Sequence, residues 1–238
     1  MKRTFLVLAM AAIGVGSALA QAPNTLTPQE QKEGWKLLFD GSSLNGWTTR
    51  GEVKVQDGAI LIKTDVAASA NTTETFDNLV LRLEFRTTPD VNSGVYIRQP
   101  PPRAGGGGGG GQGGGQAKSG AAKKRPRGPG SYEINIRETA IRPVQDSSGN
   151  YDTGSVMGVL RRTEPVTIVA GKWHSMEITG NGDHLTVVFD GKKIVDGHDT
   201  REVRPVSGTV GLQWAHPELV TGKQIEFRSI RVKALPKS

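Results

Sequence analysis

Three segments of the chain alternate apolar and polar side chains with a period of two. They are Leu79–Phe85, Asn92–Arg98 and Tyr132–Arg137. Successive side chains of a β-strand point to opposite faces, so each pattern predicts a strand with one face in a core and one polar face. The residues expected on the polar faces are Arg82, Glu84, Arg86, Tyr96, Arg98, Glu133, Asn135 and Arg137.

Further short strand patterns follow one another between turn signals such as Asp57-Gly58 and Asp190-Gly191. The segments concerned are Val53–Gln56, Ala59–Lys63, Gly154–Leu160, Val166–Val169, Trp173–Thr179, Leu185–Asp190, Lys193–Asp196, Thr209–Trp214 and Gln224–Val232. No stretch has the pattern of an amphipathic helix with caps. Many short strands with tight turns favour an all-β fold, an antiparallel β-sandwich or jelly roll.

The first twenty residues have the pattern of a secretory leader. Met1–Ala20 has a basic start, a short apolar run and small residues before Ala20. We expect cleavage after Ala20 and a periplasmic or secreted product, because the apolar run is too short to span a membrane. The chain has no Cys, which excludes a lipid anchor and disulfides. The remainder divides into a polar lead-in, 21–33, and a single domain, 34–235.

A glycine-rich tract, Pro100–Gly130, interrupts the strand pattern. Gly and Pro at this density cannot bury a core, so we expect a disordered loop that can be deleted without unfolding the domain. The tract and the leader together carry eight basic residues and no acidic one, so the formal charge of +7 leaves the rest of the chain nearly neutral. A nucleic-acid partner is therefore not expected. The basic tract could contact a polyanionic surface or a cell-wall polymer.

If the three alternating strands are neighbours, their polar residues form one face suited to a hydroxyl-rich ligand. The alternative is a salt-bridged outer surface, and the pattern alone does not decide between them. The chain has no phosphate-binding loop and no serine elbow of the G-x-S-x-G type. His174 and His184 have the context of ordinary surface residues. His216 follows a strand end, a place where functional groups are often held.

Seven short motifs appear along the chain in a fixed order. They are FDGSSLNGW, LEFRTTPDVNSGVYIR, YEINI, a DTG turn followed by MGVL, GKWHSMEI, FDGKKIVD, and GLQ with EFRSIRV. In this order they resemble the 3-keto-disaccharide hydrolase domain family over roughly Gly34 to Leu235. The resemblance implies a concanavalin A-like jelly roll whose concave sheet binds sugars. It also implies cleavage of glycosides already oxidised at the third carbon of the sugar.

A ketone at that carbon acidifies the neighbouring C–H, so a base can remove the proton and the aglycone can leave by elimination. Water can then add to the enone and complete a net hydrolysis. Such a reaction needs a base, a cationic or metal stabiliser of the enolate, and a proton donor. A divalent metal is possible, and the sequence leaves the cofactor open.

The resemblance assigns these roles residue by residue. Glu84 and Glu133 match the family's strand carboxylates, as base and acid in either order, and Arg98 matches the arginine that could hold the enolate oxygen. Gln213 would bind a sugar hydroxyl, and His216 could move protons or bind a metal. The other two residues expected to contact substrate are Tyr96 and Asn135. Two motifs depart from the family: His216 is displaced by one residue, and Asn135 stands where Gln is common.

The sequence therefore predicts an exported, carbohydrate-active enzyme that cleaves 3-keto-glycosides, with Glu84, Arg98 and Glu133 on one concave face. A non-catalytic carbohydrate-binding module of the same fold is the alternative. A structural or adhesion domain that works through the basic tract is a third possibility. Neither nucleic acid nor membrane insertion is expected.

Overall fold

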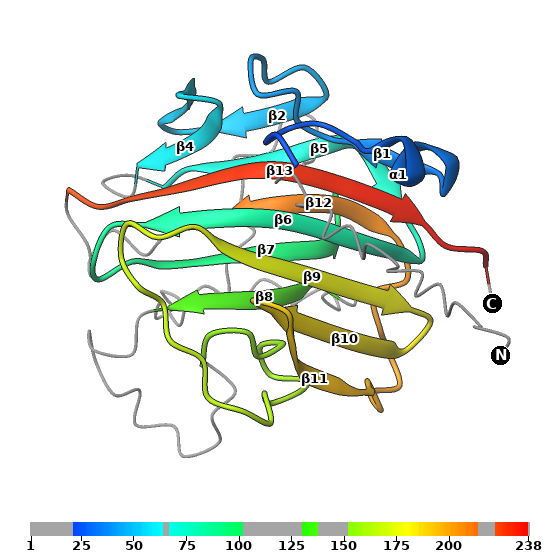
Figure 1. Ribbon diagram of the computed structural model, residues 1–238. Coiled ribbons are helices and arrows are strands. Elements are labelled where there is room, and N and C mark those ends of the chain that lie inside the picture. Colours follow the sequence, from blue (N-terminus) through cyan, green and yellow to red (C-terminus); the bar gives the residue numbers. More distant parts are fainter. Residues whose placement is uncertain (1–20, 64–66, 102–129, 138–151, 214–221, 238) are drawn as a thin grey trace, which may run out of the picture.

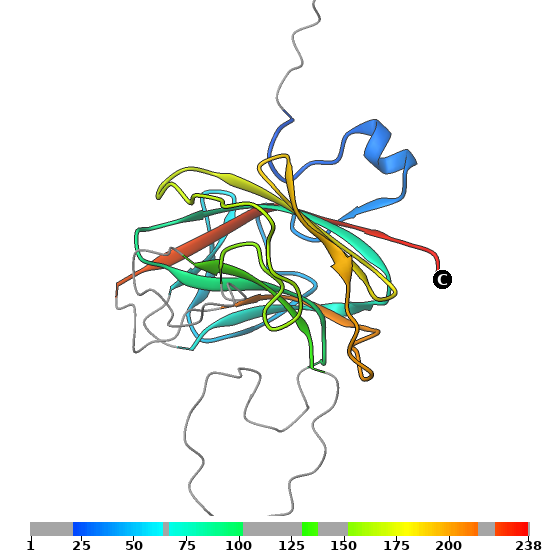
Figure 2. The ribbon, with the colours of Figure 1, turned by 90° about the horizontal axis from the view of Figure 1, so that it is seen from below.

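The structure, a computed structural model, describes residues 21–63, 67–101, 130–137, 152–213 and 222–237. Nearly all regular elements are strands, which form two antiparallel sheets packed face to face (Figure 1; Figure 2). The predicted all-β antiparallel sandwich is confirmed. No helix in these ranges is long and apolar enough to cross a membrane.

The larger sheet has eight strands in the order β11-β10-β9-β6-β13-β4-β3, with β1 paired to one end of β13. Its strands are β1 (Trp35–Leu37), β3 (Val53–Gln56), β4 (Ala59–Lys63), β6 (Leu79–Thr87), β9 (His174–Asn181), β10 (His184–Phe189), β11 (Lys192–His198) and β13 (Gln224–Ala234). The smaller sheet has the order β2-β5-β12-β7-β8. Its strands are β2 (Trp47–Arg50), β5 (Ser69–Phe76), β7 (Asn92–Gln99), β8 (Tyr132–Arg137) and β12 (Gly208–Gln213).

The core lies between the two sheets and is filled by the inward side chains of both. In β6 the buried and half-buried positions alternate without a break from Leu79 to Thr87, as the sequence pattern predicted. Val95 and Ile97 of β7 meet this layer from the smaller sheet and are fully buried, as are Ile134 and Ile136 of β8. Burying this apolar surface is the main favourable contribution to the stability of the sandwich.

Three strands and one helix were not predicted from the sequence. The strands are β1, β2 and β5. The first two have only three and four residues, and β5 is rich in Thr and lacks a regular alternation of apolar and polar residues. Conversely, Val166–Val169 is not a strand, and Gly154–Leu160 makes only isolated bridges, from Val156 to Ile134 and to Leu160. The Pro100–Gly130 tract lies almost wholly outside the described residues, and so does His216.

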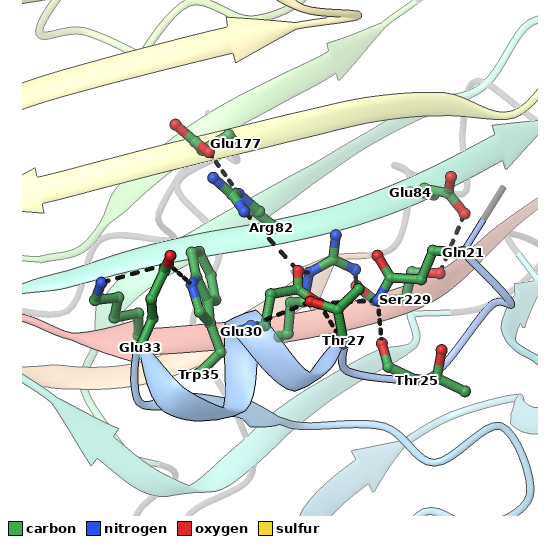
Figure 3. A network of polar contacts seen from close by, with 12 residues as sticks. Gln21, Thr25, Thr27, Glu30, Glu33, Trp35, Arg82, Glu84, Glu177 and Ser229 are labelled. Atoms are coloured by element: carbon green, nitrogen blue, oxygen red, sulfur yellow. Dashed lines mark hydrogen bonds and ion pairs between the residues drawn. The ribbon is translucent and has the colours of Figure 1, made fainter. Parts of the chain in front are cut away.

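The segment that we predicted as a polar lead-in is docked on the outer face of the larger sheet (Figure 2; Figure 3). It contains the helix α1 (Pro28–Lys32), whose capping box joins Thr27 and Glu30. The expectation that the chain has no capped helix is therefore wrong for this single short turn. A five-residue helix is too short for its apolar period to be visible in the sequence.

Glu30 is the centre of this docking (Figure 3). Its carboxylate is 8% exposed and accepts hydrogen bonds from the Thr27 N–H at 2.8 Å and the Gln21 amide at 2.9 Å. The Arg231 guanidinium lies 2.8 Å away. Burial would raise the pKa of Glu30, but the hydrogen bonds and the charge of Arg231 more than offset it and hold the pKa below its usual value.

We therefore expect Glu30→Gln to lower the free energy of unfolding by about 1–3 kcal/mol, because it leaves Arg231 without its counter-charge. Equilibrium urea unfolding measures this difference, and faster hydrogen exchange in residues 21–33 would locate it. Glu33→Gln is the matched control, because Glu33 is exposed at the end of the same helix. Equal effects of the two substitutions would contradict a specific role for Glu30.

Candidate functional site

The outer face of the smaller sheet carries a compact polar cluster around Glu133. Tyr96 of β7 and Glu133 of β8 are directly opposite each other in the strand register. The Tyr96 hydroxyl and the Gln213 amide of β12 both hydrogen-bond to the Glu133 carboxylate. Three neighbouring strands thus bring a carboxylate, a phenol and an amide together on one face, as the alternation of β7 and β8 predicted.

Gly94 forms the floor of this cluster. A Cβ atom on Gly94 would lie 2.8 Å from Gln213 Oε1 and 3.1 Å from Glu133 Oε1. Any larger residue would force the Gln213 amide to move and would crowd the Glu133 carboxylate. A glycine within a strand often marks a place where another group approaches the backbone closely. Here the approaching groups are the polar atoms of the cluster itself.

Burial changes the protonation of this cluster. Desolvation raises the pKa of Glu133 to about 7, even though the hydrogen bonds from Tyr96 and Gln213 act to lower it. Burial and the adjacent carboxylate also raise the pKa of Tyr96, so the phenol keeps its proton and remains a donor. A carboxylate whose pKa lies near neutrality can both take up and release a proton at physiological pH.

Asn135 and Gln213 both lie next to Glu133. Asn135 is 3% exposed, and its backbone N–H donates to the Ser155 carbonyl at 3.1 Å, which ties β8 to the segment that contains Ser155. Gln213 is half-buried at the end of β12. His216 is outside the described residues, so its predicted role is not tested. Among the residues that the structure does describe, no three His, Asp or Glu side chains gather in a group able to hold a metal.

Glu84 does not belong to this face, and the prediction that it shares a face with Glu133 is wrong. It projects from the outer side of β6, in the larger sheet, where its carboxylate accepts from Arg228 Nε at 2.7 Å and from Ser229 Oγ at 3.2 Å. Trp173 stacks on the same Arg228 at 4.0 Å. For the polar face of β6, the alternative reading of a salt-bridged outer surface is correct.

Arg98 was also predicted to share this face and does not. Its side chain is 1% exposed and its guanidinium lies between the two sheets, 3.6 Å from where a Cβ on Gly180 would be. Nε donates to the Asp77 carbonyl and Nη2 to Asn78 Oδ1, while Nη1 donates to the carbonyls of Gly182 and Pro205. Arg98 therefore ties loops together and is not available to hold an enolate.

A local change in the backbone of β7 explains why the alternation fails at Arg98. Its φ is 54°, in the left-handed region that few residues other than glycine adopt. The pairing of β7 with β12 shifts register at the same place: Tyr96 pairs with Gly211, but Gln99 pairs with Thr209. A β-bulge of this kind re-aims the side chain that follows it. Arg98 is consequently turned into the interior.

His174 is likewise not the surface residue that we expected. It is 1% exposed, its Nε2 accepts the Val169 N–H at 3.0 Å, and its Nδ1 lies 2.7 Å from Asp190 Oδ2. These contacts fix the neutral tautomer with the proton on Nδ1. The pair of buried His174 and exposed Asp190 joins the loop before β9 to the turn after β10, on the larger sheet and away from Glu133.

A second polar group on the same face as Glu133 was missed from the sequence. Asn71 of β5 and Gln99 of β7 approach Gly211 of β12, which pairs with Tyr96 on one side and Asn71 on the other. The signal that could have identified both groups is a glycine inside a strand pattern, at Gly94 and Gly211. The polar residues alone gave no indication, because β5 was not recognised as a strand.

Comparison with known proteins gives one family match. Residues 34–233 match the sequence profile of the 3-keto-alpha-glucoside-1,2-lyase-like domain. The match confirms the resemblance that the seven motifs indicated over roughly Gly34 to Leu235. No relative was found among curated proteins.

Solved structures similar to this chain support the fold. A candidate glycosyl hydrolase from Parabacteroides distasonis aligns with a TM-score of 0.68 at 17% identity, over 90% of this chain and 100% of that one. Another candidate glycosyl hydrolase of that organism aligns with a TM-score of 0.59 at 22% identity, over 84% and 99%. A carbohydrate-binding module, CBM66 of Bacillus subtilis, aligns with a TM-score of 0.50 at 12% identity, over 79% and 96%. The architecture is that of a jelly roll.

Proposed function

The chain belongs to the 3-keto-alpha-glucoside-1,2-lyase-like domain family, and from this premise we propose that it cleaves 3-keto-glycosides by elimination, with Glu133 as the base. The observation that carries the proposal is the Glu133 carboxylate, with a pKa of about 7, held by Tyr96 and Gln213 on the outer face of the smaller sheet. A base with a pKa near the working pH combines a useful ionised fraction with useful proton affinity.

The proposed reaction uses one carboxyl group for two proton transfers. Ionised Glu133 removes the proton from the carbon between the ketone and the glycosidic carbon. The electron pair moves into the ketone as an enolate and then expels the glycosidic oxygen, so that a carbon–carbon double bond forms and the C–O bond breaks. The departing oxygen needs one proton, and protonated Glu133 can return the one that it has just taken. Water added to the resulting enone completes the net hydrolysis.

Tyr96 and Gln213 have supporting roles in this proposal. Both donate hydrogen bonds to Glu133 and so hold its oxygens in a fixed position on the sheet. The role of enolate stabiliser, which the resemblance gave to Arg98, has to pass to another group, because the Arg98 side chain is turned between the sheets. His216 and any metal that it binds remain candidates for that role.

The decisive experiment incubates the purified protein with a 3-keto-glycoside and follows release of the aglycone, with and without a chelator. Turnover supports an enzyme, and its loss with chelator identifies a metal requirement. A substrate deuterated at the carbon beside the ketone should react more slowly if proton removal limits the rate. Absence of turnover on every 3-keto-glycoside tested, with sugar binding retained, would overturn the enzymatic proposal.

The pH dependence of kcat/KM should report the Glu133 carboxyl. Because only the ionised form is a base, kcat/KM should rise with pH and level off above about 7, falling about tenfold per pH unit below that value. The measurement is initial rates between about pH 3.5 and pH 9 with one substrate. A rising limb centred on the ordinary value of 4.5 would show that burial does not control this group.

A non-catalytic carbohydrate-binding module is the second candidate, and the resemblance in fold to CBM66 favours it. The polar side chains above Gly94 can hydrogen-bond to sugar hydroxyls without catalysing a reaction. Calorimetric titration with unoxidised sugars distinguishes the two, because a binding module should bind them as well as it binds 3-keto derivatives. We also propose that the protein is exported and cleaved after Ala20, which N-terminal sequencing of the mature protein would test.

A further inference from the structure

A second polar group lies beside the Glu133 cluster on the same sheet face. Its floor is Gly211 of β12, and its side chains are Asn71 of β5 and Gln99 of β7. A Cβ atom on Gly211 would lie 2.1 Å from Gln99 Oε1 and 2.7 Å from Asn71 Oδ1. Two amide oxygens thus converge on one point above the glycine, as Glu133 and Gln213 do above Gly94.

The two polar groups lie next to each other on strands β7 and β12. Gly211 pairs with Tyr96, and along the same register Gln213 lies beside Gly94. The two glycines are therefore diagonal neighbours on adjacent strands, with Cα atoms about 7–8 Å apart. Tyr96 hydrogen-bonds to Glu133 and is paired across the strands with Gly211, so it lies where the two groups meet. This spacing suits two linked sugar rings, one over each glycine.

The side-chain oxygen of Gln99 also lacks a partner within the described part of the chain. Its Oε1 is buried and makes no hydrogen bond there. Leaving a buried acceptor without a donor costs about 1–3 kcal/mol, so such groups in native proteins need an explanation. Asn71 Oδ1 is a second acceptor close by, so the group that would complete the site above Gly211 is a hydrogen-bond donor. A half-turn of the Gln99 amide would present a donor and an acceptor in the same place.

We propose that Asn71, Gln99 and Gly211 form a second subsite, which binds the hydroxyl groups of the aglycone ring when that ring is itself a sugar. The inference rests on the proposed function, since it takes Glu133 as the reacting centre. It assigns the substrate preference of the site to glycosides with a hydroxyl-bearing aglycone. Sugar hydroxyls can donate to both amide oxygens, whereas an alkyl aglycone would leave Gln99 Oε1 without a donor.

The test compares two substrates, a 3-keto-disaccharide and the methyl 3-keto-glucoside. Gln99→Ala and Asn71→Ala should each lower kcat/KM for the disaccharide by about 3- to 10-fold, mainly through KM. The same variants should change kcat/KM for the methyl glycoside by less than about 2-fold, because this substrate does not reach the second subsite. Gln56→Ala is the matched control, since Gln56 is exposed on the other sheet.

Gly211→Ala gives an independent route if an amide variant fails to fold. Its added methyl group would displace both amide oxygens without removing either side chain. This variant should also lower kcat/KM for the disaccharide while leaving kcat/KM for the methyl glycoside nearly unchanged. Equal losses on both substrates, or no loss on either, would overturn the second subsite even if the enzyme is active.

Absence of turnover on both substrates would refute the proposed function instead. The subsite is then judged by calorimetric binding of an unoxidised disaccharide and of methyl glucoside. Selective weakening of disaccharide binding by Gln99→Ala would support the subsite. Equal binding by wild type and variant, or no binding at all, would refute it.

Discussion

Glu133→Gln is expected to reduce kcat at least 100-fold, with KM changed little, on any 3-keto-glycoside that the wild type cleaves. The amide keeps the size of the carboxylate and can still take part in hydrogen bonds with Tyr96 and Gln213, but it cannot accept a proton from carbon. Removing a general base typically costs 10²–10⁴-fold in rate, about 3–5 kcal/mol of transition-state stabilisation. Steady-state kinetics with purified protein at about pH 8 gives both constants.

Glu84→Gln is the matched control for this result. Glu84 carries the same side chain on a strand of the other sheet, in a half-buried ion pair with Arg228, so its loss should leave kcat within about 2-fold. Thermal unfolding should show that Glu133→Gln is folded. Because burial raises the pKa of Glu133, the wild type carries an unfavourable buried charge above about pH 7, and the variant should be at least as stable there. Near wild-type turnover of Glu133→Gln would exclude Glu133 as the base.

Arg98→Ala is expected to lower the free energy of unfolding by about 3–5 kcal/mol, enough to remove most folded protein from a marginally stable domain. The substitution leaves the carbonyls of Asp77, Gly182 and Pro205 without their donor and opens a cavity between the sheets. Urea unfolding measures the loss where the variant can be purified, and soluble yield indicates it otherwise.

Arg98→Lys separates the charge from the shape of the group. A lysine has one nitrogen in place of the planar fork, so it cannot serve all four acceptors, and we expect it to recover only part of the stability. Arg228→Ala should cost about 1 kcal/mol or less, because that arginine is partly exposed in a surface ion pair. A stable but inactive Arg98→Ala protein would contradict the structural role and restore the catalytic one.

The sequence was sufficient to predict which way most side chains face within a strand. Alternation fixes this locally, since a strand presents successive side chains to opposite sides. It held along all of β6 and for the apolar residues of β7 and β8. The family resemblance was likewise predictable from the order of the motifs, because motifs depend on the residues themselves and not on strand pairing.

The alternation of side chains did not predict which strands belong to the same sheet. β6 and β7 follow each other in the chain, yet β6 pairs with β9 and β13 in one sheet while β7 pairs with β8 and β12 in the other. The chain crosses from one sheet to the other between them, so the outward faces of β6 and β7 point away from each other. For this reason Glu84 and Glu133 are on opposite sides of the molecule, although each faces outward as predicted.

The sequence by itself thus determined the all-β class, the family and the outward direction of Glu133. Only the tertiary structure decided that Tyr96, Gln213 and Gly94 surround Glu133, that Glu84 is part of a salt-bridged surface, and that a bulge turns Arg98 inward. The physical reason is the range of the interactions. Alternation is a property of neighbouring residues, whereas strand pairing, burial and the bulge at Arg98 depend on contacts between segments far apart in the chain.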